Sequence, residues 1–423
     1  MNNFKDSDFH PLFSLFHHDV STSLSGESIL NESLIKSLNQ PVSTDEKDIG
    51  DVLVEIVKES IAGLEDKEIG LTLTGGFDSR VLLSILLHLN VRPICYTYGN
   101  ENNKDIKIAG EICQRIGLTH IHVGSEEPNS ANYLKHVENT IRLDQGNAHL
   151  HRAHRTAAAQ EIALTHKPNI LFTGHLGGEQ IRGLSYNNYF SSSLFRKYIE
   201  TEDTLEKLVP EILEEYFIKP GVYETKQLVR KIKQLSWMQD DPILNRLYFI
   251  YDLIGFNHHQ QDLRIFKTYF DQVIPVFLDM RFIEVLMKSP HHFMRKTNSR
   301  FPALSHPRLY CKLLERFHTP LLDINLSNGY KPRDFNKGII YYSTKRLWTK
   351  YIHKVPNPSS FAYGNWYKDF ITVNSESIND AVWEIYDKKA YFNALKNNTH
   401  QTNEGYWHKF SNPIFFNLVL KIT

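Results

Sequence analysis

The sequence predicts an α/β protein built on an open, doubly wound, mostly parallel sheet, with a large helical C-terminal part. Short apolar runs alternate with segments of helical periodicity between residues 50 and 185. Their connections are too long for hairpins, which is typical of parallel β-α-β units. Glycine clusters follow two of the apolar runs, and such sheets bind ligands at the carboxyl ends of their strands. We therefore expect a ligand site at that edge of the sheet.

The individual elements follow from apolar spacing and from glycine punctuation. We expect strands at Ile69–Thr74, Arg92–Tyr98, His120–Val123 and Asn169–Thr173, and helices from Asp51 to Leu64, from Arg80 to Leu89 and from Lys104 to Ile116. Gly117 is the expected C-terminal cap of the last of these helices. Residues 191–290 are expected to be mainly helical with an interruption at Pro275–Asp279, and residues 291–423 are rich in aromatic side chains and turns.

The expected domain division follows these changes of pattern. Residues 1–48 are an irregular extension with room for one short helix, and residues 49–340 are the nucleotide-binding synthetase domain with a helical insertion at 191–255. Residues 341–423 form an aromatic-rich C-terminal region.

Composition excludes several functional classes. The 423 residues contain 48 Lys and Arg and 48 Asp and Glu, so the chain lacks the basic excess typical of nucleic-acid-binding proteins. Its 3 cysteines are too few for a disulfide framework or a cysteine-based zinc site. No apolar run approaches the roughly 20 residues that span a bilayer, and the first residues do not resemble a signal peptide. We expect a soluble cytoplasmic protein with neither nucleic-acid nor membrane partners.

The strongest motif is the segment Thr74-Gly75-Gly76-Phe77-Asp78-Ser79, at the junction of a strand and a helix. Two glycines allow the backbone to approach an anion, and the helix that follows offers free N–H groups and its positive dipole end. Thr74 and Ser79 add hydroxyl groups. Asp78 would repel a bare phosphate, but it suits a site where a divalent cation joins the carboxylate to the phosphates. The segment has no Walker-type lysine.

This segment resembles the Ser-Gly-Gly-x-Asp-Ser pyrophosphate loop of the ATP-pyrophosphatase superfamily, with Thr74 in place of the first serine. Further segments are similar to asparagine synthetases. Phe172–Glu179 resembles their second glycine-rich loop, and Ile274–Asp279 resembles their Val-Pro-Phe-Leu-Asp segment. The second strand and the following helix of the family are matched by Tyr96–Gly99, Asp105–Ala109 and Ile116–His120. Relatives of that branch include β-lactam synthetases and lasso-peptide cyclases. The resemblance extends over roughly residues 50–340.

The resemblance implies an ATP-dependent ligase that adenylates a carboxylate, releases pyrophosphate and transfers the acyl group to an amine or ammonia. By position, the residues implied to bind pyrophosphate and magnesium are Thr74, Gly75, Gly76, Asp78 and Ser79. Tyr98 and Gly174 are implied to contact the adenosine, and Asp78 and Glu179 to bind Mg²⁺.

Three departures from the family pattern affect the chemistry. His175 stands where the family has a glutamate, and an imidazole can take over its role as general base near neutral pH. Gly178-Glu179 replaces an Asp-Glu pair, which removes one expected metal ligand and leaves Glu179 as a candidate catalytic and metal-binding residue. Lys331 is the candidate for the family's catalytic lysine, and Arg333 is its rival.

The N-terminal glutaminase domain of complete family members is not expected, because too little sequence precedes the loop to hold it. The expected substrates are a small-molecule or peptide carboxylate, such as a peptide natural product or a sugar acid, and an amine or ammonia. Further biosynthetic proteins are the expected partners. Two alternatives stay open: a catalytically inactive nucleotide-binding or scaffold protein, and a tRNA-modifying enzyme, against which the zero net charge and the absence of zinc-ribbon cysteines argue.

Overall fold

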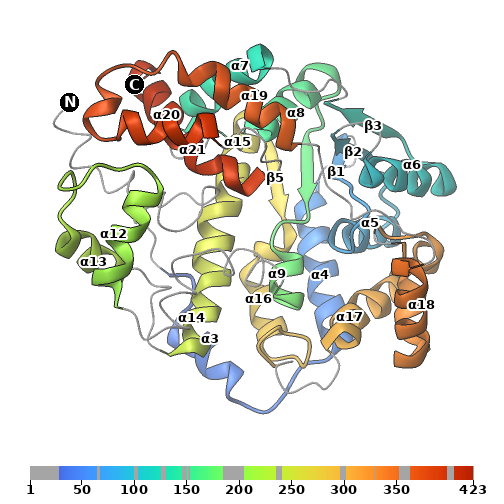
Figure 1. Ribbon diagram of the computed structural model, residues 1–423. Coiled ribbons are helices and arrows are strands. Elements are labelled where there is room, and N and C mark those ends of the chain that lie inside the picture. The colour runs from blue at the N-terminus through green and yellow to red at the C-terminus, as the bar shows by residue number, and fades with distance from the viewer. Residues whose placement is uncertain are drawn as a thin grey trace.

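The computed structural model describes residues 28–63, 67–99, 103–124, 130–144, 150, 153–183, 204–234, 241–295, 302–327, 329–351, 363–397 and 404–422. The strands in these residues form one sheet of five, in the order β3-β2-β1-β4-β5, and every neighbouring pair is parallel. The bounds of the strands are Ile69–Thr72 for β1, Ile94–Tyr98 for β2, His120–Val123 for β3, Ile170–Thr173 for β4 and Gln272–Pro275 for β5. The predicted doubly wound α/β sheet is confirmed (Figure 1).

Strand β1 is the centre of the sheet. Leu71 of β1 pairs with Cys95 of β2 on one side and with Phe172 of β4 on the other. The strand order therefore reverses at β1, and the crevice beyond the carboxyl ends of β1 and β4 is where an open sheet of this kind binds its ligand.

Apolar side chains cover both faces of the sheet because neighbouring residues of a strand point to opposite faces. Phe172 belongs to a core cluster with buried residues of α4, α5, α6, α16 and α17. Its neighbour Leu171 belongs to a second cluster with buried residues of α7, α8, α15, α19 and α21. Each face thus packs against its own set of helices.

Helices make up most of the rest of the described chain. Their bounds are Glu32–Leu38 (α3), Glu46–Ile61 (α4), Asp78–His88 (α5), Lys104–Ile116 (α6), Ser130–Asp144 (α7), Ala153–Thr165 (α8), Gly177–Arg182 (α9), Leu205–Glu215 (α12), Thr225–Lys233 (α13), Pro242–Tyr248 (α14), Gln260–Tyr269 (α15), Met280–Met287 (α16), Pro302–Phe317 (α17), Ile339–Tyr351 (α18), Tyr363–Ser375 (α19), Lys388–Asn397 (α20) and Glu404–Ile422 (α21). A π-helix spans Phe249–His259, and short 3-10 helices span Val276–Leu278, Thr319–Asp323, Pro332–Lys337 and Val382–Glu384.

Helix α6 shows how closely local signals can fix an element. The side chain of Asn103 caps its first turn by accepting a hydrogen bond from the backbone N–H of Asp105 at 2.9 Å. Buried Ile106, Ala109, Ile112 and Cys113 form its apolar stripe. Gly117 ends the helix with a φ of 71°, in the left-handed region that favours glycine, as predicted.

The described part of the N-terminal segment is packed against the domain. Helix α3 contacts α16, the hydroxyl of Thr44 donates to the carbonyl of Val285 at 2.7 Å, and Arg295 donates to the carbonyls of Ser37 and Gln40. Residues 1–27 of the predicted extension lie outside the described residues. The expected domain boundaries stay predictions.

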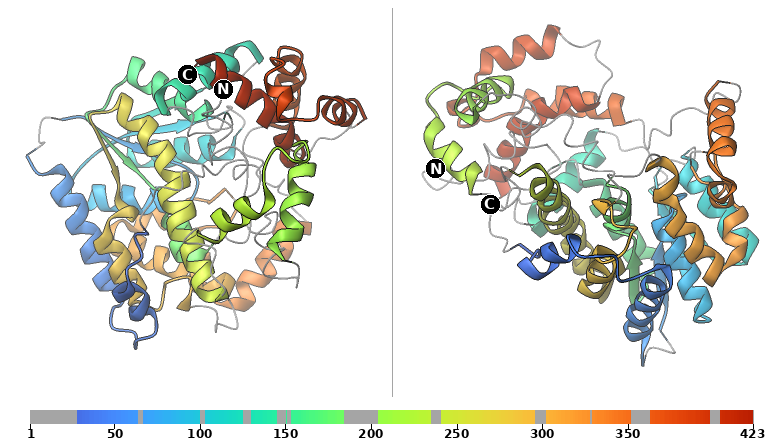
Figure 2. Two further views of the ribbon diagram at one scale, coloured as in Figure 1. Left: turned by 90° about the vertical axis from the view of Figure 1, so that its left-hand side faces the viewer. Right: turned by 90° about the horizontal axis from the view of Figure 1, so that it is seen from below.

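The described parts of the segments 191–255 and 341–423 are helical, and both lie around the sheet domain. Helices α12 and α13 lie at one end of the molecule and α18 at the other, while α19 and α21 pack beside α7 (Figure 2). Across the described ranges, none of the helices combines the length and the apolar character that a membrane crossing requires. The three cysteines, Cys95, Cys113 and Cys311, are buried free thiols.

Candidate active site

The segment between β1 and α5 folds into a tight loop that its own hydroxyl groups hold. The backbone N–H of Thr74 donates to Oγ of Ser79 at 3.0 Å, and the two hydroxyl oxygens lie 3.2 Å apart. The N–H of Gly76 donates to Oγ1 of Thr74 at 3.3 Å. These bonds bring together three of the five residues that the sequence assigns to pyrophosphate, at the carboxyl end of the central strand.

Gly75 is required by the close approach of a neighbouring helix. A Cβ atom at this position would lie 2.7 Å from Oδ1 of Asp105 and 3.2 Å from Cδ1 of Ile108, both on α6. Its backbone N–H donates to Asp105 Oδ1 at 3.0 Å. Burial raises the pKa of Asp105, and the Gly75 N–H only partly offsets that effect. Asp105 is therefore a residue of the site whose role was not predicted from the sequence.

Asp78, the first residue of α5, lies against α17. The Tyr310 hydroxyl donates to Oδ1 of Asp78, and the Tyr310 ring stacks on Phe77 with centroids 4.8 Å apart. Burial raises the pKa of Asp78, outweighing the nearby Arg182 cation and the Tyr310 hydroxyl. Tyr310 is fully buried, and its pKa lies well above the ordinary value because of burial and the Asp78 charge.

The second glycine-rich loop, between β4 and α9, packs directly on the start of α5. A Cβ atom at Gly174 would lie 3.2 Å from both Cβ of Asp78 and the backbone nitrogen of Ser79. A Cβ atom at Gly177 would lie 2.8 Å from Oδ1 of Asp78. The two loops that the sequence predicts to form one site are thus in contact, and glycine permits that contact.

Arg182, the last residue of α9, faces the same carboxylate. Its Nη2 atom lies 3.7 Å from Oδ2 of Asp78, and its guanidinium lies over the ring of Tyr310, 5.6 Å from the centroid. A Cβ atom at Gly178 would lie only 2.8 Å from that same Nη2 atom. Glu179 is half-buried on the same short helix, and its charge contributes to raising the pKa values of Arg182 and Tyr310.

His175 lies in a second polar cluster, between β4 and α15. Its Nδ1 lies 2.9 Å from the hydroxyl oxygen of Thr173, and its Nε2 lies 3.4 Å from Oδ2 of Asp262. Asp262 is fully buried and also forms an ion pair with Arg155. The ring of His259 lies edge-on to that of His175, with centroids 5.1 Å apart. Asp262 and Arg155 were not identified from the sequence.

Tyr98, the residue expected to contact adenosine with Gly174, ends strand β2. It is half-buried, and its ring lies 6.0 Å from that of His154 on α8. Both Tyr98 and Gly174 therefore stand at the carboxyl edge of the sheet, as the sequence predicts. Their contact with a nucleotide stays a prediction.

Buried Arg80 fixes a later segment beside the loop. Its guanidinium donates to the carbonyl oxygens of Leu321 at 3.2 Å, Ile324 at 2.7 Å and Asn325 at 2.8 Å. Burial lowers the pKa of Arg80 to about 10. These bonds bring the chain that leads to Lys331 alongside α5, and the Cβ of Ser327 would lie 3.4 Å from a Cβ at Gly75.

Lys331 is exposed, at the start of the 3-10 helix Pro332–Lys337. Arg333 is the larger cause of the lowered pKa of Asp323, and the Lys331 charge contributes to it as well. Arg333, the rival candidate, makes two hydrogen bonds of 2.8 Å to the Asp323 carboxylate. In the described residues no ion pair involves the Lys331 ammonium, so of the two cations it is the one still available to a substrate.

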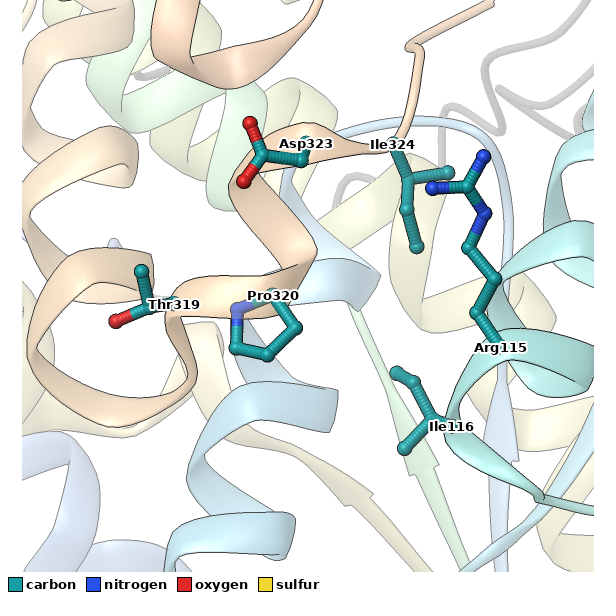
Figure 3. A pocket seen from close by; sticks show the side chains of 6 residues that line it. All are labelled: Arg115, Ile116, Thr319, Pro320, Asp323 and Ile324. Carbon is teal, nitrogen blue, oxygen red and sulfur yellow. The ribbon is translucent and has the colours of Figure 1, made fainter.

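A cavity of about 410 Å³ lies at the other end of α6 from Asp105. Arg115 and Ile116 line it from the last turn of α6, and Thr319, Pro320, Asp323 and Ile324 line it from the segment after α17 (Figure 3). Because α6 rises about 1.5 Å per residue, Arg115 lies roughly 15 Å along the helix axis from Asp105. This cavity is therefore separate from the phosphate loop.

Residues 48–255 match the family model for asparagine synthase. This part of the chain is an asparagine synthetase-like synthetase domain. The matched segment contains both glycine-rich loops and strands β1 to β4. The family consists of ATP-dependent ligases that form carbon–nitrogen bonds, and that is the class of chemistry to which the domain belongs. No curated protein matches the chain.

The family usually uses Mg²⁺ with its ATP, and the donors beside Asp78 bear on whether the protein itself could hold that ion. Mg²⁺ prefers near-octahedral oxygen ligands. Of the two Asp78 oxygens, one accepts the Tyr310 hydroxyl and the other faces Arg182, while Gly178 brings no side-chain oxygen. No group of three or more His, Cys, Asp or Glu among the described residues is placed to hold a metal. These donors do not fit a metal held by the protein, and binding at Asp78 and Glu179 stays a prediction.

Proposed function

We propose that this chain is an AMP-forming amide ligase that does not hydrolyse glutamine. An oxygen of a substrate carboxylate forms a bond to the α-phosphorus of ATP, and the bond from that phosphorus to the bridging oxygen breaks, which releases pyrophosphate. The nitrogen of an amine or of ammonia then attacks the acyl carbon, AMP leaves, and one proton of the nitrogen is transferred to a base.

The observation that carries this proposal is the pair of glycine-rich loops in contact at the carboxyl ends of β1 and β4. The first loop places two hydroxyls at the start of helix α5, and this arrangement suits an anion. The N–H groups of Gly75 and Gly76 donate to Asp105 and Thr74, so a bound anion would have to take over these two hydrogen bonds. The loop has no lysine of the kind that cradles a γ-phosphate. Such a site suits the release of pyrophosphate as a unit, and its contribution is positioning and electrostatic stabilisation.

His175 is the proposed base for the second step. The Asp262 carboxylate near Nε2 favours the tautomer that carries its hydrogen there, which leaves the lone pair on Nδ1, beside the Thr173 hydroxyl. Glu179, on the neighbouring turn, is the other proposed base. Lys331 is proposed to stabilise the negative charge of the α-phosphate. The adenosine is proposed to lie between Tyr98 and Gly174.

The carboxylate substrate is proposed to come from a specialised biosynthetic pathway, as a peptide or a sugar acid. The test is ATP–pyrophosphate exchange with a panel of carboxylates, followed by chromatography of the nucleotide products. We expect exchange with a subset of the panel and AMP as the product. Formation of ADP would contradict the proposal.

One observation favours the alternative of a nucleotide-binding protein without catalysis: Asp78 faces a guanidinium instead of a second carboxylate. That alternative predicts that ATP binds, as measured by calorimetry, while no carboxylate in the panel supports exchange.

A further inference from the structure

The Asp78 carboxylate is enclosed by protein groups of one particular kind. Tyr310 donates to one oxygen, Arg182 lies 3.7 Å from the other, and the backbones of Gly177 and Gly178 pack against both. Each of these neighbours is a donor or a cation, and the Glu179 carboxylate is also close enough for its charge to act on Arg182 and Tyr310. A positively charged group, the Arg182 guanidinium, thus already lies beside Asp78 without a metal.

Arg182 lies in the space that a side chain at position 178 would fill. Residues 178 and 182 are one helical turn apart on α9, so they share one face. The Nη2 atom of Arg182 lies 2.8 Å from where a Cβ of residue 178 would be, and a Cβ there would also lie 3.2 Å from Oδ2 of Asp78. The absence of a side chain at 178 and the presence of arginine at 182 are thus two parts of one arrangement.

The Arg182 guanidinium is held in place and retains a free donor. Its planar group lies over the Tyr310 ring, which is itself stacked on Phe77. Its Nε–H is buried and has no acceptor within the described residues. A guanidinium presents its donors in a rigid fork that matches phosphate oxygens, so this side chain is suited to a phosphate group arriving at the loop.

From this geometry we infer that Arg182 supplies, from the protein itself, the positive charge that a bound metal would supply beside Asp78, and that it binds the pyrophosphate end of ATP. The inference rests on the proposed function for the identity of the ligand. Asp78 then positions the guanidinium through their ion pair, and any metal ion enters with the nucleotide instead of being held by Asp78 and Glu179.

The test uses isothermal titration calorimetry with inorganic pyrophosphate and the full chain, in EDTA and then in excess Mg²⁺. We expect the wild-type protein to bind pyrophosphate in EDTA. Arg182→Ala should weaken that binding by about 10- to 100-fold, the range of a lost hydrogen bond to a charged group, and Mg²⁺ should not restore it. Arg182→Lys keeps the positive charge but not the forked donors of the guanidinium, so its affinity for pyrophosphate should lie between those of the wild type and Arg182→Ala.

Arg115→Ala is the matched control. It removes the same charge from the far end of α6, where Arg115 pairs with Glu111 at 2.6 Å, and it should bind pyrophosphate as the wild type does. Circular dichroism of each variant checks the fold. If Arg182→Ala does not fold, two measurements still test the role of Arg182: the pyrophosphate affinity of Arg182→Lys, and the Mg²⁺ dependence of pyrophosphate binding by the wild type.

The reciprocal variant is Gly178→Asp combined with Arg182→Gly, which places a second carboxylate beside Asp78. It should bind pyrophosphate only when Mg²⁺ is present. The inference is overturned if the wild type needs Mg²⁺ to bind pyrophosphate or does not bind it at all, or if Arg182→Ala binds it normally. A wild-type protein that binds pyrophosphate in EDTA but supports no ATP–pyrophosphate exchange would contradict the proposed ligase while leaving the role of Arg182 intact.

Discussion

The backbone N–H of Gly75 donates to Oδ1 of Asp105 at 3.0 Å, so a buried carboxylate on α6 accepts a hydrogen bond from the loop that is expected to bind phosphate. This contact joins the first β-α unit to the second. It also places a negative charge beside an anion site, and burial raises the pKa of that carboxyl.

Two variants separate the hydrogen bond from the charge. Asp105→Asn keeps an oxygen acceptor for the Gly75 N–H and removes the charge, so the free energy of unfolding should stay the same or rise. Asp105→Ala leaves that N–H without its acceptor and should lower the free energy of unfolding by about 1–3 kcal/mol. Urea denaturation measures both. Equal losses in the two variants would show that the charge, and not the acceptor, matters.

Asp78→Asn should abolish ATP–pyrophosphate exchange, because the variant loses the carboxylate that orients Arg182. Its melting temperature should stay the same or rise, since the amide is less costly to bury than a carboxylate. Calorimetry and the exchange assay measure the two effects on the same preparation. Exchange at the wild-type rate would show that Asp78 has no part in adenylation.

Asp78 also predicts how the free energy of unfolding should depend on pH. Asp78 has a raised pKa in the folded protein, so it binds a proton more tightly when folded, and protonation favours folding. Its contribution to the free energy of unfolding is therefore lost as the pH rises from the ordinary value of 3.8 through the folded pKa. Asp78→Asn should show a smaller fall over that range in urea denaturation.

Glu46 is a control for this pH dependence, because its pKa is lowered in the folded protein whereas that of Asp78 is raised. Burial raises its pKa, but hydrogen bonds with Lys312 and its own backbone, together with His291, outweigh burial and hold the pKa at about 2. Its contribution to the free energy of unfolding should be lost as the pH falls from 4.5 towards 2. In the Glu46→Gln variant, the free energy of unfolding should therefore fall less over this acid range than in the wild type.

The first four strands and helices α5 and α6 could be predicted because their signals are local. Apolar runs, glycines and one cap define them. Strand β5 was missed: it is four residues long, its first three residues lie in a stretch expected to be mainly helical, and only Pro275 lies in the expected interruption at Pro275–Asp279. Its pairing with β4 depends on residues about 100 positions earlier, which no local pattern reveals.

The site shows the same division. The loop from Thr74 to Ser79 could be predicted from its glycines and hydroxyls. Tyr310 and Asp262 could not, because each comes from a distant helix that carries no motif of its own. Arg182 had a signal that was passed over: it lies one helical turn after Gly178, the position where the expected carboxylate is absent.

Gly174→Ala tests whether the contact between the two loops is needed. The added Cβ would lie 3.2 Å from the backbone nitrogen of Ser79, an atom that cannot move aside as a flexible side chain can. We expect a loss of ATP binding together with a lower melting temperature. The control is Gly110→Ala, within α6, where the nearest atom would lie 3.5 Å away and alanine should stabilise the helix by up to about 1 kcal/mol. Equal behaviour of the two variants would contradict the importance of the loop contact.

His175→Ala should spare pyrophosphate exchange and slow only amide formation, by about 10²–10⁴-fold for the loss of a general base. The deficit should shrink as the pH rises, because the amine then loses its proton unaided. Asp262→Asn should show the same pattern more weakly, since it disturbs the tautomer of His175 without removing the ring. Single-turnover measurements of each step separate the effects. Unchanged amide formation in His175→Ala at neutral pH would direct the search for the base to Glu179.

Lys331→Ala should slow both adenylation and amide formation, by about 10²–10³-fold, because negative charge on the α-phosphate is present in both steps. Arg333→Ala is the matched comparison. Arg333 already forms an ion pair with Asp323, so removing it should affect stability slightly and neither step strongly. The structure leaves Lys331 exposed beside this pair, which requires the lysine side chain to turn towards the loop when ATP binds. Quenched-flow measurement of both steps decides between the two cations. A large loss in Arg333→Ala with none in Lys331→Ala would reverse the assignment and imply that the arginine leaves Asp323 for the phosphate.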